Sequence, residues 1–408
     1  MDGMHMTLSP RAKAWAVVLC DLAMMALAVA INLFPIFLTS LSHDIGGAKG
    51  LTKEQLGRIG AVSFSGLVLG IITIGPLADR LGGRVFAVGG NVLIAIGLVF
   101  LGRARGYDML LASAFVLGLG AGTLDLVLSP MVSALEPDRR TAAMNLLHSF
   151  YCIGAVATIL LGVLALRFGV SWRTVAQGLV PFPLVLAAFF LLAALPPMVH
   201  PGEARTPIKS MLIEPFFLAG MIAIFLGGAT ELGMAYWLPD YAEKTLGFSR
   251  WWAGMGFLGF SLGMSIGRIG VGFLPRSVGP IKLMLICSAA SVVFFLLGSF
   301  SQSSVLALSC CVLVGFSGSC LWPSTLAVAA DRFPLGGATM FAVLSMLGNL
   351  GGIVMPWIVG VVADCASLRL GLATATLCPL GLIPILLWMR NRSADVGPIA
   401  PVETAMIP

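Results

Sequence analysis

The sequence predicts an all-α membrane protein with twelve transmembrane helices in two pseudo-symmetric bundles of six. Composition is the first reason: 58% of the 408 residues are hydrophobic and only 10% are charged, whereas charged residues make up about a quarter of a soluble domain. The mean hydropathy of +1.00 agrees with this composition. The other two reasons are the number of long apolar runs and a similarity between the two halves of the chain.

Each predicted span is an apolar run long enough to cross a bilayer, which takes roughly 20 helical residues. The first run is too long for the apolar region of a signal peptide, so we interpret it as a membrane span. Twelve runs lie between charged or Pro/Gly-rich breaks, at residues 14–40, 54–79, 84–102, 108–135, 141–166, 171–195, 212–240, 250–274, 280–300, 303–330, 335–363 and 368–390.

A polar, proline-rich connection at 196–211 separates the sixth run from the seventh. It predicts a cytoplasmic linker between an N-terminal bundle at 1–195 and a C-terminal bundle at 212–390. The remaining residues, 391–408, are predicted to form a cytoplasmic tail.

The two halves are similar at an offset of 193 to 197 residues. GPLADRLG, starting at Gly75, matches GFLPRSVG, starting at Gly272, and Asp138-Arg139 matches the later Asp-Arg pair at 331–332. Parallel repeats of this size are typical of transporters built from two bundles around a central site.

Several functional classes are excluded by the sequence. The net charge is +6, but Lys and Arg form no dense runs, so nucleic acid is not an expected partner. The eight cysteines lie in apolar runs without metal-binding spacing, so we expect no metal or other cofactor. GMGFLG at 254–259 has the glycine spacing of a nucleotide loop but lies inside a predicted span, and no Walker A or H-E-x-x-H sequence occurs. We therefore predict no enzymatic activity.

Alternate loops differ in their content of Lys and Arg, and the richer set lies on the side of both termini. Short cytoplasmic loops are enriched in these residues, so both termini are predicted to be cytoplasmic. We expect a monomeric, multi-pass protein of the plasma membrane, with a bacterial inner membrane as the expected location.

One carboxylate, Asp125, lies in the interior of the fourth apolar run, about 15 Å from the end of that run at Leu135. An acid inside lipid is costly unless it lines a watery cavity or has a partner. The fifth run carries Asn145, His148 and Tyr151 on one helix face at a similar depth, where they could bind solute hydroxyls. We interpret this group as a proton-linked solute site in which Asp125 and His148 titrate. The alternative is that Asp125 pairs with His148 or with a backbone group only to pack the two helices.

The seventh run contains a second acid, Glu231, followed by Tyr236 and Trp237. Aromatic rings beside a polar centre suit the apolar face of a sugar. We therefore predict that Glu231 takes part in proton coupling and solute binding, and that the two rings contact the solute. The alternatives are an interhelical pair for Glu231 and an interfacial aromatic belt for the rings.

Two further charged residues lie inside predicted spans. Arg268 in the eighth run either snorkels to the interface or neutralises an acid. Asp21 lies near the start of the first run, and we interpret it as structural. The second half offers additional candidates for the solute site in spans ten and eleven: Trp322, Ser324, Thr325, Asn349 and Trp357.

The turn GPLADRLGGR at 75–84 resembles the loop signature G-x-L-a-D-R-x-G-x-[KR] of the major facilitator superfamily. With the twelve spans and the half-repeat, the resemblance covers nearly the whole chain and implies the major facilitator fold. It also implies that this turn latches the two bundles on the cytoplasmic side, because breaking such charge pairs lets the bundles rock. The alternative is that its charges are solvated and only set topology. The predicted gate residues are Gly75, Asp79, Arg80, Gly82, Arg84, Asp138 and Arg139.

Within the superfamily, spans four and five resemble the fucose:proton symporter branch. GTLDLVLSP at 122–130 matches that branch's G-x-L-E-x-x-x-N-P, which implies a proton-carrying role for Asp125. NLLHSFYCIG at 145–154 matches N-L-x-Q-x-F-N-x-x-G, which implies that His148 and Tyr151 replace two sugar-binding amides. The branch's second acid has no counterpart in the first span, where Asn32 is the nearest polar side chain.

The sequence therefore predicts a secondary active transporter that works by alternating access in the lipid bilayer. The expected reaction is proton-coupled symport of a small polar solute, with a monosaccharide or related sugar as the expected solute. Two other classes remain open: a proton-driven exporter of drugs or organic acids, and a non-transporting membrane receptor or sensor.

Overall fold

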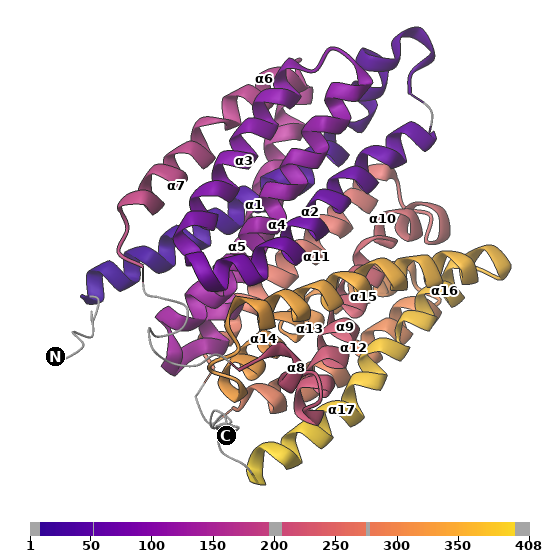
Figure 1. Ribbon diagram of the computed structural model, residues 1–408. Coiled ribbons are helices and arrows are strands. Elements are labelled where there is room, and N and C mark those ends of the chain that lie inside the picture. Colours follow the sequence, from indigo (N-terminus) through magenta and orange to yellow (C-terminus); the bar gives the residue numbers. More distant parts are fainter. Residues whose placement is uncertain (1–8, 52, 196–205, 275–277, 396–408) are drawn as a thin grey trace. The chain divides into compact units, whose positions relative to one another are not determined.

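The computed structural model describes residues 9–51, 53–195, 206–274 and 278–395 (Figure 1). Most of the predicted linker, Arg276 and the end of the predicted tail lie outside the described residues. In the described part, every regular element is helical, and twelve stretches are long and apolar enough to cross a membrane. The predicted fold class is therefore confirmed.

The chain folds into two compact units. Unit 1 comprises Met1–Pro137 with Phe150–Pro201, and unit 2 comprises Asp138–Ser149 with Gly202–Pro408. Helix α5 (Arg140–Arg167) therefore begins in unit 2 and continues in unit 1. The bundle boundaries predicted from the linker stay a prediction.

Unit 1 is built around α4, which packs against α1, α2 and α3. The contact with α2 depends on glycine: a Cβ at Gly118 would lie 1.9 Å from the Ser63 carbonyl oxygen, and one at Gly122 would lie 2.1 Å from that of Leu67. Small residues four apart allow helix backbones to approach closely in membranes. The helices of this unit besides α5 are α1 (Pro10–Gly46), α2 (Lys53–Leu81), α3 (Gly83–Arg103), α4 (Tyr107–Leu135), α6 (Trp172–Leu179) and α7 (Pro181–Leu192).

Unit 2 contains several membrane spans that are broken into shorter helices, among them the span made of α13 and α14. In Figure 1, its helices run from pink at α8 and α9 through orange to yellow at α17. They are α8 (Ile208–Met211), α9 (Pro215–Ala235), α10 (Leu238–Asp240), α11 (Arg250–Val271), α12 (Pro280–Phe300), α13 (Ser304–Gly318), α14 (Leu321–Arg332), α15 (Gly337–Cys365), α16 (Leu368–Ala375) and α17 (Leu377–Asp395), and a π-helical turn at Tyr241–Thr245 follows α10.

The internal repeat is visible in helix packing as well as in sequence. In unit 2, a Cβ at Gly315 of α13 would lie 2.5 Å from the carbonyl oxygen of Phe260 in α11. This contact is the counterpart of the one between Gly118 and Ser63, since both positions shift by 197 residues (118 to 315, 63 to 260). Each unit therefore contains the same close approach of two helices at an equivalent place.

Candidate functional site

Asp125 lies on α4 and is the only residue from 120 to 133 that is not buried. It follows Gly118 by seven residues and Gly122 by three, so it continues the helix face that packs on α2. In the described part of the chain, no hydrogen bond or ion pair involves its side chain. A carboxylate without a counter-ion is therefore half-buried at a level where its neighbours on α4 are fully buried.

The other predicted site residues of unit 1 are Asn32 and Tyr151, and both side chains are half-buried. Asn32 donates through Nδ2 to the Ala28 carbonyl oxygen of its own helix at 2.8 Å. Asp21 is deeper than its place in the predicted run suggested, because α1 begins at Pro10 and puts it about 16 Å from the helix start. It is 3% exposed, and its Oδ1 has no hydrogen-bond partner among the described residues.

In unit 2, the beginning of α5 is joined to α14 by polar contacts of Arg140 and Asn145, which we call the α5–α14 seam. Arg140 forms an ion pair with Asp331, with Nη1 and Oδ1 2.7 Å apart. Further along α5, Nδ2 of Asn145 donates to Oγ of Ser324 at 3.0 Å. The Oδ1 atom of Asn145 is buried and has no donor in the described part of the chain. A buried oxygen of this kind can accept a hydrogen bond from a group outside the protein, such as water or a solute hydroxyl.

Arg268 lies on α11 and connects three other elements of unit 2. Its Nη2 forms an ion pair with Oε2 of Glu231 on α9 at 2.7 Å. Its Nη1 donates to the carbonyl oxygen of His148 on α5 at 2.9 Å, and its Nε donates to that of Ser319 at 2.9 Å. The sequence left two interpretations open for Arg268, and in the structure it neutralises an acid rather than snorkelling to the interface. Arg268 is 3% exposed and the Glu231 side chain 14%, so the carboxylate lies on the accessible side of the pair.

The contact between Arg268 and Ser319 has a local cause in the sequence. In a continuous helix, the Ser319 carbonyl would accept from the backbone N–H of residue 323, but that residue is Pro323, which has none. Helix α13 ends at Gly318, and α14 begins at Leu321. Because a backbone carbonyl inside a membrane needs a donor, the Arg268 guanidinium takes the place of the missing N–H.

The aromatic candidates of unit 2 differ in accessibility. The Trp322 ring packs on two glycines, since a Cβ at Gly348 would lie 2.4 Å from it and one at Gly228 would lie 3.0 Å away. Its Nε1 is buried without an acceptor in the described part of the chain. Trp237 instead donates to the carbonyl oxygen of Pro356 at 2.9 Å. Tyr236 packs edge-on against Trp237, with ring centroids 5.4 Å apart, and is 69% exposed.

Asn349, the remaining candidate on α15, is half-buried. Its Nδ2 donates to the Ser345 carbonyl oxygen one turn earlier, at 2.9 Å. This bond satisfies one donor of the amide within its own helix and leaves the solute-binding role of Asn349 a prediction.

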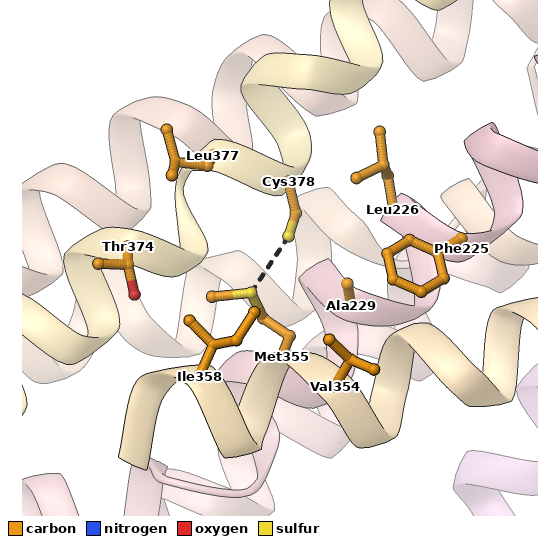
Figure 2. A pocket seen from close by; sticks show the side chains of 9 residues that line it. All are labelled: Phe225, Leu226, Ala229, Val354, Met355, Ile358, Thr374, Leu377 and Cys378. Atoms are coloured by element: carbon orange, nitrogen blue, oxygen red, sulfur yellow. Dashed lines mark hydrogen bonds between the residues drawn. The ribbon is translucent and has the colours of Figure 1, made fainter. Parts of the chain in front are cut away.

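A pocket in unit 2 lies among α9, α15, α16 and α17, and none of the candidate residues lines it (Figure 2). The Thr374 hydroxyl donates to the Gly371 carbonyl oxygen at 2.6 Å, and the Cys378 thiol donates to the Met355 sulfur at 3.4 Å. The polar groups of the lining are therefore satisfied within the protein, and the pocket suits apolar groups better than a polar solute. The lining residues are Phe225, Leu226, Ala229, Val354, Met355, Ile358, Thr374, Leu377 and Cys378.

The predicted gate residues at the turn after α2 have different surroundings. Gly75 and Asp79 are buried, Arg80 is exposed, and Gly82 has the positive φ of 82° that allows the chain to turn into α3. Arg84 donates through Nη2 to the Ala193 carbonyl oxygen after α7 at 2.7 Å.

At the second predicted hinge, Asp138 is exposed, and Arg139 donates to the carbonyl oxygen of Gly272 at 3.5 Å. The ion pair at this place is made by Arg140, which the sequence analysis did not select. The sequence comparison treated Asp138-Arg139 and the residues at 331–332 as equivalent positions of the repeat. In the structure, Asp331 contacts Arg140, the residue that follows Arg139. A repeat offset identifies equivalent positions but not contacting ones. Ser319 was also missed, although Pro323 four residues later was a usable signal.

The described residues contain no group of three His, Cys, Asp or Glu side chains placed to hold a metal ion. The eight cysteines are free, and six are buried among apolar helices.

In the described part of the chain, twelve helical stretches are long and apolar enough to span a membrane, and charged and polar groups are buried among them. These features indicate a multi-pass membrane protein. The family profile of the Major Facilitator Superfamily matches residues 20–356. The chain therefore belongs to this superfamily of transporters, as its turn signature indicated.

The individual proteins that this chain resembles differ in the solutes that their names give. Multidrug resistance protein MdtL of Vibrio parahaemolyticus serotype O3:K6 is 28% identical over 239 residues, which are 57% of this chain and 59% of that relative. The chain thus matches about three fifths of the relative's length. FucP, the E. coli fucose:proton symporter, superposes with a TM-score of 0.79 at 21% identity, over 93% of this chain and 99% of FucP. The human organic anion transporter MFSD10 gives a TM-score of 0.77 at 16% identity, over 93% of this chain and 100% of that one. The two structures show the shared fold.

Proposed function

We propose that this transporter couples proton movement to symport of a small, uncharged polar solute, with a monosaccharide or related sugar as the expected class. Asp125 is the proton carrier in this proposal. The observation that carries it is the setting of Asp125: a half-buried acid within a membrane span, without a counter-ion among the described residues. Intramembrane acids of this kind mark proton pathways in transporters.

The solute-binding part of the proposal is supported by unit 2. Asn145 Oδ1 and Trp322 Nε1 are a buried acceptor and a buried donor without partners in the described part of the chain. Hydroxyl groups donate and accept, so a polyol could satisfy both types of group. Glu231 adds an accessible acceptor, whereas its ion pair with Arg268 gives it a fixed counter-ion. We therefore assign Glu231 to solute binding rather than to proton exchange. His148, Tyr151, Asn32 and Asn349 complete the proposed set of polar groups.

A second candidate is proton-driven export of drugs. It is favoured by the sequence similarity to the multidrug resistance protein MdtL. Export and symport differ in the solutes that stabilise the protein and in the direction of accumulation. A thermal-shift screen of the purified protein against sugars, sugar acids, nucleosides and cationic dyes separates them, because a ligand raises the stability of the form that it binds.

The test of the function uses the best ligand of that screen in proteoliposomes with an imposed pH gradient. We expect the wild type to accumulate the solute together with protons. Asp125→Asn should equilibrate the solute without concentrating it. Asp108→Asn is the matched control, because Asp108 is an exposed acid in the first turn of the same helix. Normal accumulation by Asp125→Asn would refute the carrier assignment.

A further inference from the structure

We propose that Arg268 forms an anion-binding site which the protein fills with its own carboxylate, Glu231, and that this occupant makes the transporter reject anionic solutes. The inference rests on the proposed function, because it specifies the charge of the solute that unit 2 accepts. It makes Glu231 a specificity-determining residue.

Positive charge is scarce in the interior of the protein. Among the described side chains, Arg268 is the only lysine or arginine that is buried. An anionic solute drawn into a membrane protein needs a cation to compensate for lost hydration. In the described part of unit 2, Arg268 is therefore the group that an anion would have to use.

The Arg268 guanidinium is already occupied. All three of its nitrogens donate: Nη2 to Glu231, Nη1 to the carbonyl of His148 and Nε to the carbonyl of Ser319. The two carbonyls are backbone groups and are fixed by α5 and by the break before α14. Of these three acceptors, Glu231 is the one that belongs to a side chain, so it is the one that an external carboxylate could replace.

The Glu231 carboxylate covers the accessible side of the ion pair. Its side chain is 14% exposed, whereas Arg268 behind it is 3% exposed. An incoming solute therefore meets carboxylate oxygens before it meets the guanidinium. These oxygens accept hydrogen bonds from hydroxyl groups and repel anions.

Removal of the Glu231 side chain should open the site to an external anion. Glu231→Ala leaves a desolvated guanidinium with space where the carboxylate had been. A small carboxylate such as formate fits this chemistry, because paired oxygens match the guanidinium fork.

The experiment measures thermal unfolding of the purified full-length protein with formate and with formamide, its uncharged analogue, at constant ionic strength. We expect formate to raise the melting temperature of Glu231→Ala saturably by about 2–4 °C. Formamide should not do so. Wild type should respond to neither. Asp240→Ala removes an accessible carboxylate of the same span, paired with Lys244, and serves as the control for general loss of an acid.

The double variant Glu231→Ala/Arg268→Gln should lose the formate response, because the cation is gone. A wild type stabilised by formate, or a folded Glu231→Ala without a formate response, would overturn the inference. If Glu231→Ala does not fold, Glu231→Gln is measured for uptake of a labelled sugar acid against its parent sugar. A ratio of sugar-acid uptake to sugar uptake that equals the wild-type ratio overturns the inference. This experiment is independent of the test of the proposed function. If Asp125→Asn still accumulates the solute while formate still raises the melting temperature of Glu231→Ala, the proposed function fails and the anion-site inference stands.

Discussion

Glu231 and Asp125, both within membrane-spanning helices of this protein, have contrasting surroundings. Glu231 on α9 has a buried arginine as its counter-ion, held in place by two backbone carbonyls. Asp125 on α4 has no ion pair among the described residues, although the residues around it on the same helix are buried. A paired acid keeps a constant charge, whereas an unpaired acid in a poorly solvated place is most readily neutralised by a proton. The same functional group is therefore suited to two different tasks.

The largest expected difference between variants of the two acids is in the protons that the protein takes up or releases when it binds solute. When a ligand from the thermal-shift screen is added to purified protein in weak buffer, we expect protons to be taken up or released. Asp125→Asn should abolish this signal, while Glu231→Gln should retain it at a higher ligand concentration. A pH-indicator dye measures the signal. If Glu231→Gln abolishes it and Asp125→Asn does not, the two roles are reversed.

The next effect concerns stability. Arg268→Gln should destabilise the protein by about 3–5 kcal/mol, because it leaves the largely desolvated Glu231 carboxylate unpaired. It also removes the donor to the Ser319 carbonyl. Unfolding in mixed micelles with increasing denaturing detergent measures the loss. Glu231→Gln/Arg268→Gln should be less destabilised than Arg268→Gln alone, since no charge is left unpaired. Equal losses would show that the ion pair is not the cause.

A smaller effect is expected from the helix contact beneath Asp125. Gly118→Ala places a Cβ 1.9 Å from the Ser63 carbonyl oxygen, so α2 and α4 must move apart. Overpacking of this kind costs about 1–3 kcal/mol. The same unfolding assay measures it. Gly89→Ala is the matched control, because a Cβ there meets no atom within 4 Å. Equal stability of the two variants would contradict the close packing.

The smallest effect is expected in the α5–α14 seam. The hydrogen bond between Asn145 and Ser324 should contribute about 0.6 kcal/mol, the average for such bonds in membrane proteins. A double-mutant cycle with Asn145→Ala and Ser324→Ala measures this coupling. Asn145→Ala should also weaken solute binding, because it removes the buried Oδ1 acceptor. Unchanged affinity in a thermal-shift titration would exclude Asn145 from the solute site.

The sequence by itself determined the fold class, the twelve spans and the superfamily. These follow from the length of apolar helices that a bilayer requires and from a turn signature whose glycine adopts a positive φ at Gly82. The sequence also pointed to the two intramembrane acids, because a carboxylate in an apolar run stands out wherever it folds. The repeat offset was accurate enough to identify equivalent glycine contacts 197 residues apart, 118 to 315.

Only the tertiary structure decided which acid has a partner. Arg268 is 37 residues from Glu231 along the chain and 120 from His148, and no periodicity links positions on separate helices. Their contacts depend on helix packing and on the break that Pro323 introduces before α14. An ion pair between helices forms when packing brings two charges within a few ångströms away from water, and that distance is a property of the folded chain.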